Sequence, residues 1–340
     1  MNIRNTIQKL YKSNANALDT KNIIVKHDQI NSQQIKYIRD EFASTKYNIP
    51  DIPHYLDRCN MKTTIHLGTI KIEMMYANIA ANHLTTNQLT TNQLNTNQLI
   101  NQLIKVIKRL YILTQIYAIT KDIHYIFLPI DNARKFPESG KLVTPINING
   151  AYTYPRHNEV FIYRLEDYAK VMIHELLHHT IIESQTVWTP AQINNLKHAF
   201  NISKSSEFLP NEALVEVWAT IYQLTFLSVE YNVPFSWFYE RECDWARSQT
   251  SRLLYHQKTL NKEAIWTEKT NAFTYIVLKT IFLLNLGKFL EIHLPYNTPE
   301  LYNFILEHKN IEKNQNIDKF KNTKMNNYKK SMRISLFGDL

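Results

Sequence analysis

The stretch VMIHELLHHTII, Val171 to Ile182, constrains the fold of this chain more than any other, because it places three histidines and a glutamate inside an apolar helical pattern. On a helix of 100° per residue, His174 and His178 lie one turn apart on one face, with Glu175 between them and slightly to one side. Apolar residues share that face, so these polar groups would be buried, and a buried polar group without a partner is costly. The fold must therefore bring a partner or a metal ion to this helix.

A histidine pair spaced at i, i+4 meets the needs of a zinc ion. Zinc takes imidazole nitrogens at about 2.0–2.1 Å, and both rings can point at one atom without distorting the helix. Glu175 then stands where a carboxylate reaches a water on the metal instead of the metal itself. The motif His-Glu-x-x-His also arises by chance in roughly a few of every hundred chains of this composition. A second element is needed to support a zinc site.

The stretch PNEALVEVWATIY, Pro210 to Tyr222, provides that second element. Pro210 is favoured in the first turn of a helix, and Glu212 and Glu216 follow one turn apart on one face. A catalytic zinc needs a third protein ligand and an open position for water, and Glu212 can be that ligand. Glu216 can accept the free ring N–H of a ligand histidine. The alternative is two exposed glutamates, which the dipole at a helix start also favours.

The pair HELLH and NEALVE resembles the gluzincin metallopeptidases, the thermolysin-like group, in which one helix carries His-Glu-x-x-His and a later one carries Asn-Glu-x-x-x-Asp or a relative. The resemblance implies that His174, His178 and Glu212 bind one Zn²⁺ per chain. It implies Glu175 as the general base, and Glu216 in the place of the Asp that contacts a ligand histidine.

The resemblance covers only Lys141 to about Ile221. Because Glu216 has a longer arm than the usual Asp, the two helices would stand slightly farther apart. The segment between the motifs is predicted to contain its own helix, since Thr189 and Gln192 make a capping box around Pro190.

Other arrangements of the site fit less well. A metzincin needs Gly and a third His soon after the second ligand, where this chain has Ile181 and Gln185. His179 points about 100° away from His178 and is interpreted as a structural residue, and His198 is disfavoured as the third ligand. The residue that stabilises the oxyanion is left open among three downstream candidates: Tyr255, His256 and Tyr275.

The predicted fold class is α+β and mostly helical, a zincin-like catalytic domain with a small sheet before the active-site helix and an α-helical N-terminal region. Only five glycines occur, which disfavours glycine-rich nucleotide-binding loops and turn-rich all-β folds. Alternating apolar runs predict three strands, one of which would be the edge strand that receives substrate in this family: 123–130, 148–154 and 158–165.

Three regions are predicted along the chain. Residues 1–120 are expected to be helical, with helices near 72–81 and 99–119 around a low-complexity insertion near 84–98, where leucine recurs every five residues. Residues 121–307 would form the zincin-like metallopeptidase domain. Residues 308–340 would form a basic, flexible tail.

Charge and hydropathy limit the partners. The chain holds 39 Lys and Arg against 30 Asp and Glu, a formal charge of +9, but much of the excess lies in the tail. That tail has few aromatic residues for base stacking, so a solvated segment is favoured over a nucleic-acid contact, and a peptidase acting on DNA-bound proteins is only a weak alternative. The apolar run 272–290 is interrupted by Lys279, Asn285 and Lys288. It predicts a core helix and no membrane span.

Cysteine usage and the N-terminal residues indicate a reducing compartment. Cys59 and Cys243 cannot form a disulfide framework, and the first residues lack the apolar run of a secretory signal. We therefore expect a cytoplasmic protein. The abundance of Asn, Ile and Lys is typical of AT-rich genomes, such as those of some large DNA viruses, in which case the compartment would be the host cytoplasm.

The function expected from the sequence is a zinc-dependent peptidase that hydrolyses peptide bonds of a peptide or protein substrate. The alternative is a catalytically inactive zincin-like protein that acts as a binding or structural module. The coordination of the metal distinguishes them, because a catalytic zinc keeps an open position, whereas His179 recruited as a fourth ligand would close the site.

Overall fold

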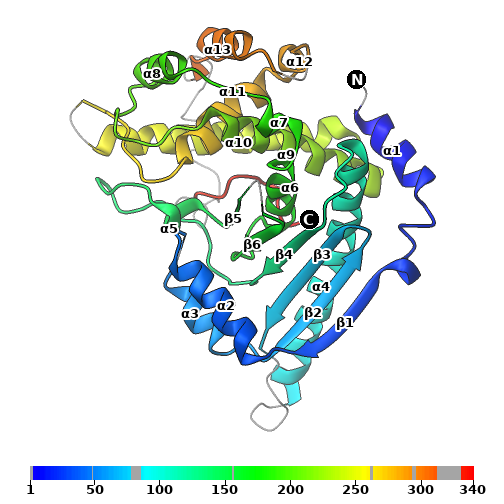
Figure 1. Cartoon of the computed structure of the whole chain (residues 1–340). Coiled ribbons are helices and arrows are strands. Elements are labelled where there is room, and N and C mark those ends of the chain that lie inside the picture. Colours follow the sequence, from blue (N-terminus) through cyan, green and yellow to red (C-terminus); the bar gives the residue numbers. More distant parts are fainter. Residues whose placement is uncertain are drawn as a thin grey trace.

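One mixed sheet of six strands forms the centre of the fold (Figure 1). The computed structural model describes residues 3–47, 49–77, 86–154, 157–260, 263–292, 296–311 and 331–340, and for residues 86–95 only the backbone. The strands in chain order are β1 (Ile24–Gln29), β2 (Met61–Leu67), β3 (Ile70–Tyr76), β4 (Ile123–Phe127), β5 (Ala151–Thr153) and β6 (Glu159–Ile162). The coarse prediction of an α+β fold is confirmed.

The strand order is β1-β2-β3-β4-β6-β5, and it leaves β5 at one edge of the sheet. β1, β2 and β3 form an antiparallel meander, and β3, β4 and β6 run parallel. β5 pairs antiparallel with β6, in a register that sets Ala151 opposite Ile162. The three strands predicted from the sequence are therefore present as β4, β5 and β6. The segment predicted at 148–154 is a strand only from Ala151, because its first residue ends the short helix α5 (Pro145–Ile148) and the next two connect α5 to β5.

The prediction that residues 1–120 are helical is wrong for three segments, which form three of the six strands. β1, β2 and β3 lie in this region, and β3 occupies residues that were expected to begin a helix near 72–81. A short apolar run fits either a helix or a strand. Here the two-residue turn between β2 and β3 favours the strand. Gly68 begins that turn at φ 58°, and it sets Leu67 opposite Ile70. A domain boundary at residue 120 would consequently cut through one sheet.

The leucine repeat leads into a helix that begins earlier than predicted. Residues 78–85 lie outside the described residues, and α4 (Thr86–Ile116) starts inside the insertion predicted near 84–98. The helix predicted near 99–119 is confirmed, and its apolar face is buried at four positions with helical spacing: Leu103, Val106, Leu110 and Leu113. α4 lies against β2 and β3.

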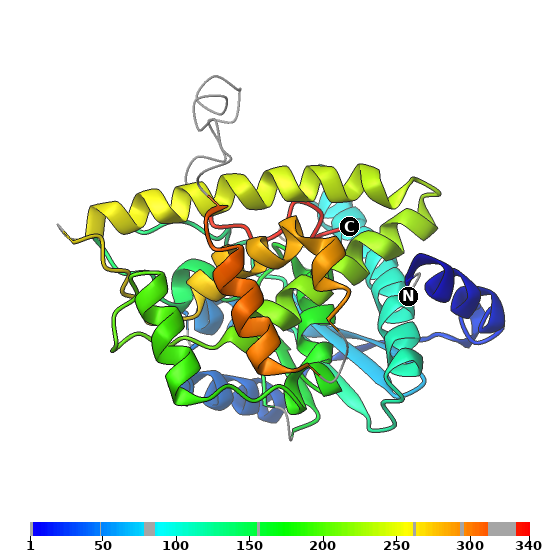
Figure 2. The ribbon, with the colours of Figure 1, turned by 90° about the horizontal axis from the view of Figure 1, so that it is seen from above.

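Helices cover both faces of the sheet. On one face lie α2 (Ser32–Ala43) and α3 (Asp51–Leu56), whose Phe42 and Ile52 pack with Phe161 of β6. The other face carries α4 and α6 (Tyr168–Leu177), which share a larger core with the C-terminal helices. Those C-terminal helices gather on one side of the sheet (Figure 1), and the long α10 runs along the molecule (Figure 2).

The helical second half agrees with the prediction. Its helices are α7 (Ile181–Ser184), α8 (Pro190–Ala199), α9 (Pro210–Glu230), α10 (Phe235–Leu260), α11 (Lys279–Leu284), α12 (Leu286–Phe289) and α13 (Thr298–Glu307), with α1 (Ile3–Ser13) at the other end of the chain. The capping box of Thr189 and Gln192 closes the start of α8 as predicted. Residues 272–283 of the apolar run lie in the core and contain a π-helical turn, Thr274–Leu278, whereas Leu290 at the end of the run is exposed. No helix among the described residues is both long and apolar enough to cross a bilayer.

The predicted flexible tail is wrong for its last ten residues. Residues 312–330 lie outside the described part of the chain, but residues 331–340 pack against the start of α6, with Met332 and Ser335 fully buried. Arg333 pairs with Asp167 at 2.9 Å, and the carbonyl of Gly338 accepts the Lys170 N–H at 3.0 Å. Buried side chains and hydrogen-bonded carbonyl groups hold this segment in place. The prediction of a flexible tail depends on the basic residues that precede it.

Candidate metal centre

The candidate centre lies where α6 faces α9. Lys170 and His174 lie at i and i+4 of α6, and His178, at i+8, is the residue that ends this helix. They face Glu212 and Glu216, which lie one turn apart near the start of α9. Two rows of side chains with helical spacing therefore meet between the helices, as the sequence predicted for four of the five residues.

The three predicted ligands come together. The ligand atoms of His174, His178 and Glu212 all lie within 4.8 Å of one another, and no other group of this kind occurs among the residues that the structure describes. The two histidine Nε2 atoms are 3.1 Å apart. Glu212 Oε2 lies 3.4 Å from Nε2 of His174 and 3.7 Å from Nε2 of His178. The geometry brings two nitrogens and one carboxylate oxygen to a single point.

The hydrogen bonds around this point fit a bound cation. His174 Nδ1 lies 2.8 Å from Glu216 Oε2, so the ring N–H at Nδ1 donates there and Nε2 faces His178 and Glu212. On the other ring, His178 Nδ1 lies 3.6 Å from Glu183 Oε2. Glu212 Oε2 is buried and accepts no hydrogen bond. Two nitrogens and one carboxylate oxygen thus converge, and without protons on these atoms they form a donor set that zinc prefers.

The electrostatics of the centre also favour a positive charge. Burial raises the pKa of Glu216, but the charge of Lys170 and the contact with His174 outweigh it and lower that pKa to about 2. Burial lowers the pKa of His174, but its contacts with Glu212 and Glu216 outweigh it and raise that pKa to about 10. The carboxylates are therefore ionised and hold a proton on the imidazole. A metal ion would take the place of that proton.

Glu175, the predicted general base, lies beside the ligands and is not one of them. It is 5% exposed, and burial raises the pKa of its carboxyl group above the ordinary value. With His174 and Tyr275 it lines a small cavity that also borders Ala151, the first residue of β5. A carboxyl group in this position can exchange a proton with a molecule bound next to the centre.

Only one of the three oxyanion candidates lies at the centre. The ring of Tyr275 is 6.0 Å from that of His174, and its hydroxyl contributes to lowering the pKa of Glu212. Burial raises the pKa of Tyr275 well above its ordinary value, so the hydroxyl keeps its proton and can donate it in a hydrogen bond. His256 instead bonds to the carbonyl of Lys141 at 2.9 Å, and Tyr255 is 71% exposed.

The remaining histidines near the motif are not ligands in this geometry. His179 lies with Nδ1 2.7 Å from Lys121 Nζ and Nε2 3.4 Å from Thr153 Oγ1, so it links α6 to β5, in agreement with the structural role predicted for it. Neither His179 nor His198 belongs to the cluster of ligand atoms, which has no fourth His, Cys, Asp or Glu among the described residues. A tetrahedral ion held by these three residues would have one position left for another ligand.

Sequence reasoning missed two residues that orient the ligands. Lys170 is fully buried and contacts Glu216, and Glu183 lies beyond the second ligand, close to His178. Both carried a signal, since Lys170 precedes His174 by one helical turn and Glu183 follows His178 by five residues.

Comparison with known proteins gives no match to a family model, to a curated protein or to a solved structure. The centre is therefore interpreted from its own geometry.

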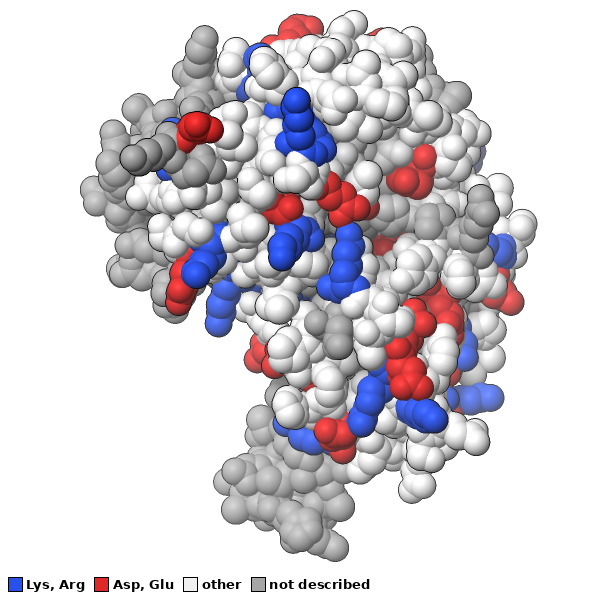
Figure 3. All heavy atoms as spheres, turned by 60° about the vertical axis from the view of Figure 1, so that its left-hand side comes forward, with Lys and Arg blue, Asp and Glu red and all other residues white. Residues whose placement is uncertain are grey.

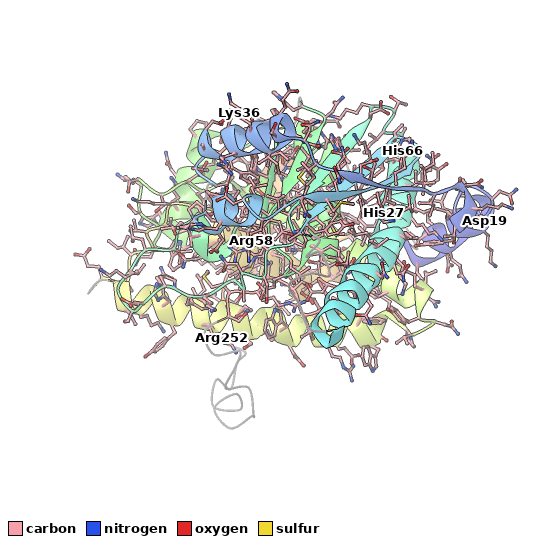
Figure 4. The ribbon with its side chains drawn as sticks, turned by 90° about the horizontal axis from the view of Figure 1, so that it is seen from below. Asp19, His27, Lys36, Arg58, His66 and Arg252 are labelled. Carbon is pink, nitrogen blue, oxygen red and sulfur yellow. The ribbon has the colours of Figure 1, made fainter. Side chains whose placement is uncertain are left out.

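Charged side chains of both signs lie on the surface of the described residues. Lys and Arg are interspersed with Asp and Glu on the face shown in Figure 3. Arg333 at the end of the basic stretch is paired with Asp167 and Asp339. The basic and histidine residues labelled in Figure 4 are scattered over α2, the turn after α3, α10 and the strands β1 and β2, which lie on the side of the sheet opposite β5.

Proposed function

We propose that this chain is a zinc-dependent peptidase of the gluzincin type, with one zinc bound by His174, His178 and Glu212. The observation that carries the proposal is the convergence of these three donor atoms, with a buried carboxyl group, Glu175, beside them and no fourth ligand residue among the described residues. Zinc at this point would supply a Lewis acid for a peptide carbonyl and would make water more acidic.

The side chains of the centre have separate roles in this proposal. Glu175 accepts the proton of the attacking water and returns it to the leaving amine, a task that suits a carboxyl group with a raised pKa. Tyr275 donates a hydrogen bond to the carbonyl oxygen as negative charge develops on it. Glu216 accepts the Nδ1–H of His174 and thereby fixes the tautomer and direction of that ring.

The sheet supports the same proposal. β5 is an edge strand that pairs on one side only, it runs antiparallel to β6, and it lies against α6. An extended peptide can add to such an edge through main-chain hydrogen bonds. A zincin-like fold, with the substrate lying along β5 next to Glu175, is therefore part of the proposal.

Metal content and one substitution test the function. Elemental mass spectrometry of the purified chain should give about one zinc per molecule, and Glu212→Ala and His178→Ala should lose most of it. Glu175→Gln should keep the zinc and lose hydrolysis of a peptide mixture. A folded wild type that is purified without chelator and holds no metal would refute the zinc site, and a Glu175→Gln variant as active as the wild type would remove Glu175 from its role.

The second candidate is a zincin-like binding or structural module. It is favoured by the burial of the centre, since His174 and Glu175 are only 6% and 5% exposed. Zinc-loaded wild type that cleaves nothing in a diverse peptide mixture would make this the leading interpretation.

A further inference from the structure

A small cavity of about 30 Å³ lies directly against the groups that would carry the chemistry. His174, Glu175 and Tyr275 form one wall, and the backbone leading into β5 at Gly150 and Ala151 forms another. Its remaining lining includes Ile334, which comes from the C-terminal segment, residues 331–340. Groups far apart in the sequence thus line one partly open space between the candidate base and the edge strand.

A peptide that lies along β5 with its scissile bond at Glu175 must direct a neighbouring side chain into this space, because side chains of a strand alternate between its two faces. We propose that the cavity receives the side chain that flanks the scissile bond and admits only small residues, namely Gly, Ala or Ser, and that Ile334 sets its depth. This inference rests on the proposed peptidase function.

The volume of the cavity gives the size limit. A water molecule needs about 10–15 Å³ of such a cavity, so the space of about 30 Å³ holds two or three groups of that size. The methyl of Ala or the hydroxymethyl of Ser fits. The side chains of Leu or Phe would require the walls to move.

Hydrogen bonds hold those walls in place. The Ile334 N–H donates to Asp167 Oδ2 at 3.2 Å, and its carbonyl accepts from Lys279 Nζ at 2.8 Å. On the opposite side, Arg134 donates to the carbonyl of Ile148 at 2.5 Å. Expansion of the cavity would break buried hydrogen bonds, which is unfavourable because their partners would be left unsatisfied.

Charge does not select the side chain, although two cations line the cavity. Arg134 is already paired with Glu166 and Asp167, and Lys170 is paired with Glu216. No carboxylate from a substrate is needed to neutralise these two cations, so the cavity selects the substrate side chain by its size.

The test uses zinc-binding probes of different side-chain size on the zinc-loaded full chain. N-acetylalanine hydroxamate and N-acetylleucine hydroxamate share the group that chelates zinc and differ in the side chain. By calorimetry, the wild type should bind the alanine probe at least about tenfold more tightly than the leucine probe. Ile334→Ala should remove or reverse this preference, and Ile334→Val should give an intermediate one.

Leu336→Ala is the matched control, because it shortens a neighbouring side chain that does not line the cavity. It should keep the wild-type preference. A wild type that binds both probes equally, or Ile334 and Leu336 variants that behave alike, would overturn the inference and leave the cavity as an internal water site. The readout is binding, so it is decided separately from the hydrolysis test of Glu175→Gln, whose failure would concern the proposed function alone.

Discussion

At the scale of single residues, Glu216 is the side chain on which the centre depends most. One of its oxygens accepts from His174 Nδ1 at 2.8 Å, and the other contacts Lys170 Nζ. Its longer arm, compared with the Asp that the resemblance leads one to expect, is therefore anchored at both oxygens. Lys170 reaches it from α6 itself, one turn before His174. A buried ion pair of this kind fixes a direction more than it adds stability.

Replacing Lys170 tests that positioning role. Lys170→Met should lower the zinc affinity by about 10- to 100-fold, because Glu216 would lose the contact that aims it at His174. Competition with a chelator of known affinity measures the change. Arg109→Met is the control, since Arg109 is equally buried but pairs with Glu230 at the other end of α9. Equal losses of affinity in both variants would reduce Lys170 to a general contribution to stability.

At the scale of secondary structure, the helical segment around Tyr275 is positioned by its own start and by its π-turn. Glu268 is 4% exposed and accepts the N–H groups of Ala272 at 2.7 Å and Phe273 at 3.2 Å. The π-turn, Thr274–Leu278, follows at once and directs Tyr275 toward His174. Such turns are rare and occur often at functional sites.

Burial raises the pKa of Glu268 to about 8, and this shift has a consequence for stability. The ordinary value, 4.5, applies to the unfolded chain, so between about pH 4.5 and 8 the folded state holds a proton that the unfolded state has lost. The folded state is therefore favoured by this group at low pH, and the stability is lost as the pH rises toward 8.

Glu268→Gln should remove this dependence, because the amide stays neutral at every pH. The free energy of unfolding should be measured in urea on metal-free protein between pH 5 and 8. As the pH rises, the value for the variant should increase relative to that of the wild type by up to about 1.4 kcal/mol per pH unit. Glu263→Gln, at an exposed position nearby, should follow the wild type. Parallel curves for the wild type and Glu268→Gln would contradict the shift.

At the scale of the whole molecule, the last ten residues connect distant parts of the chain at the start of α6. Asp167 accepts from Arg333 and from the N–H of Ile334. Gln223 of α9 donates to the carbonyl of Phe337 at 2.9 Å. The segment therefore touches both helices that carry the candidate ligands, and its packing should affect the geometry between them.

Gly338 gives a direct test of this packing. A Cβ atom there would lie 2.2 Å from Asp167 Oδ1 and 2.7 Å from its Cγ, so Gly338→Ala should destabilise the protein by about 1–3 kcal/mol in urea unfolding. Gly287 in α12 has nothing within 4 Å of such a Cβ. Gly287→Ala should be neutral or stabilising by up to about 1 kcal/mol. A neutral Gly338→Ala would show that the segment is not tightly packed at this point.

The sequence by itself determined the features that depend on local spacing. The i, i+4 rows of His174 with His178 and of Glu212 with Glu216, the capped start of α8 and the buried face of α4 all follow from the period of a helix and the chemistry of its first turn. These properties involve residues a few positions apart, so neighbours in the chain suffice to predict them. The placement of the four side chains in one centre agreed with that spacing.

Only the tertiary structure decided which distant surfaces meet. β3 is a strand because β2 and β4 pair with it, although its residues fit a helix equally well. Tyr275 lies at the centre and His256 does not, because the π-turn and the packing of α10 place them differently. Ile334 and Lys170 contact Asp167 and Glu216, which are more than 40 positions away from them in the chain. Burial and pairing between distant residues leave no periodic pattern in the sequence. For this physical reason the wall of the cavity at Ile334 and the contact of Lys170 with Glu216 could be identified only from the tertiary structure.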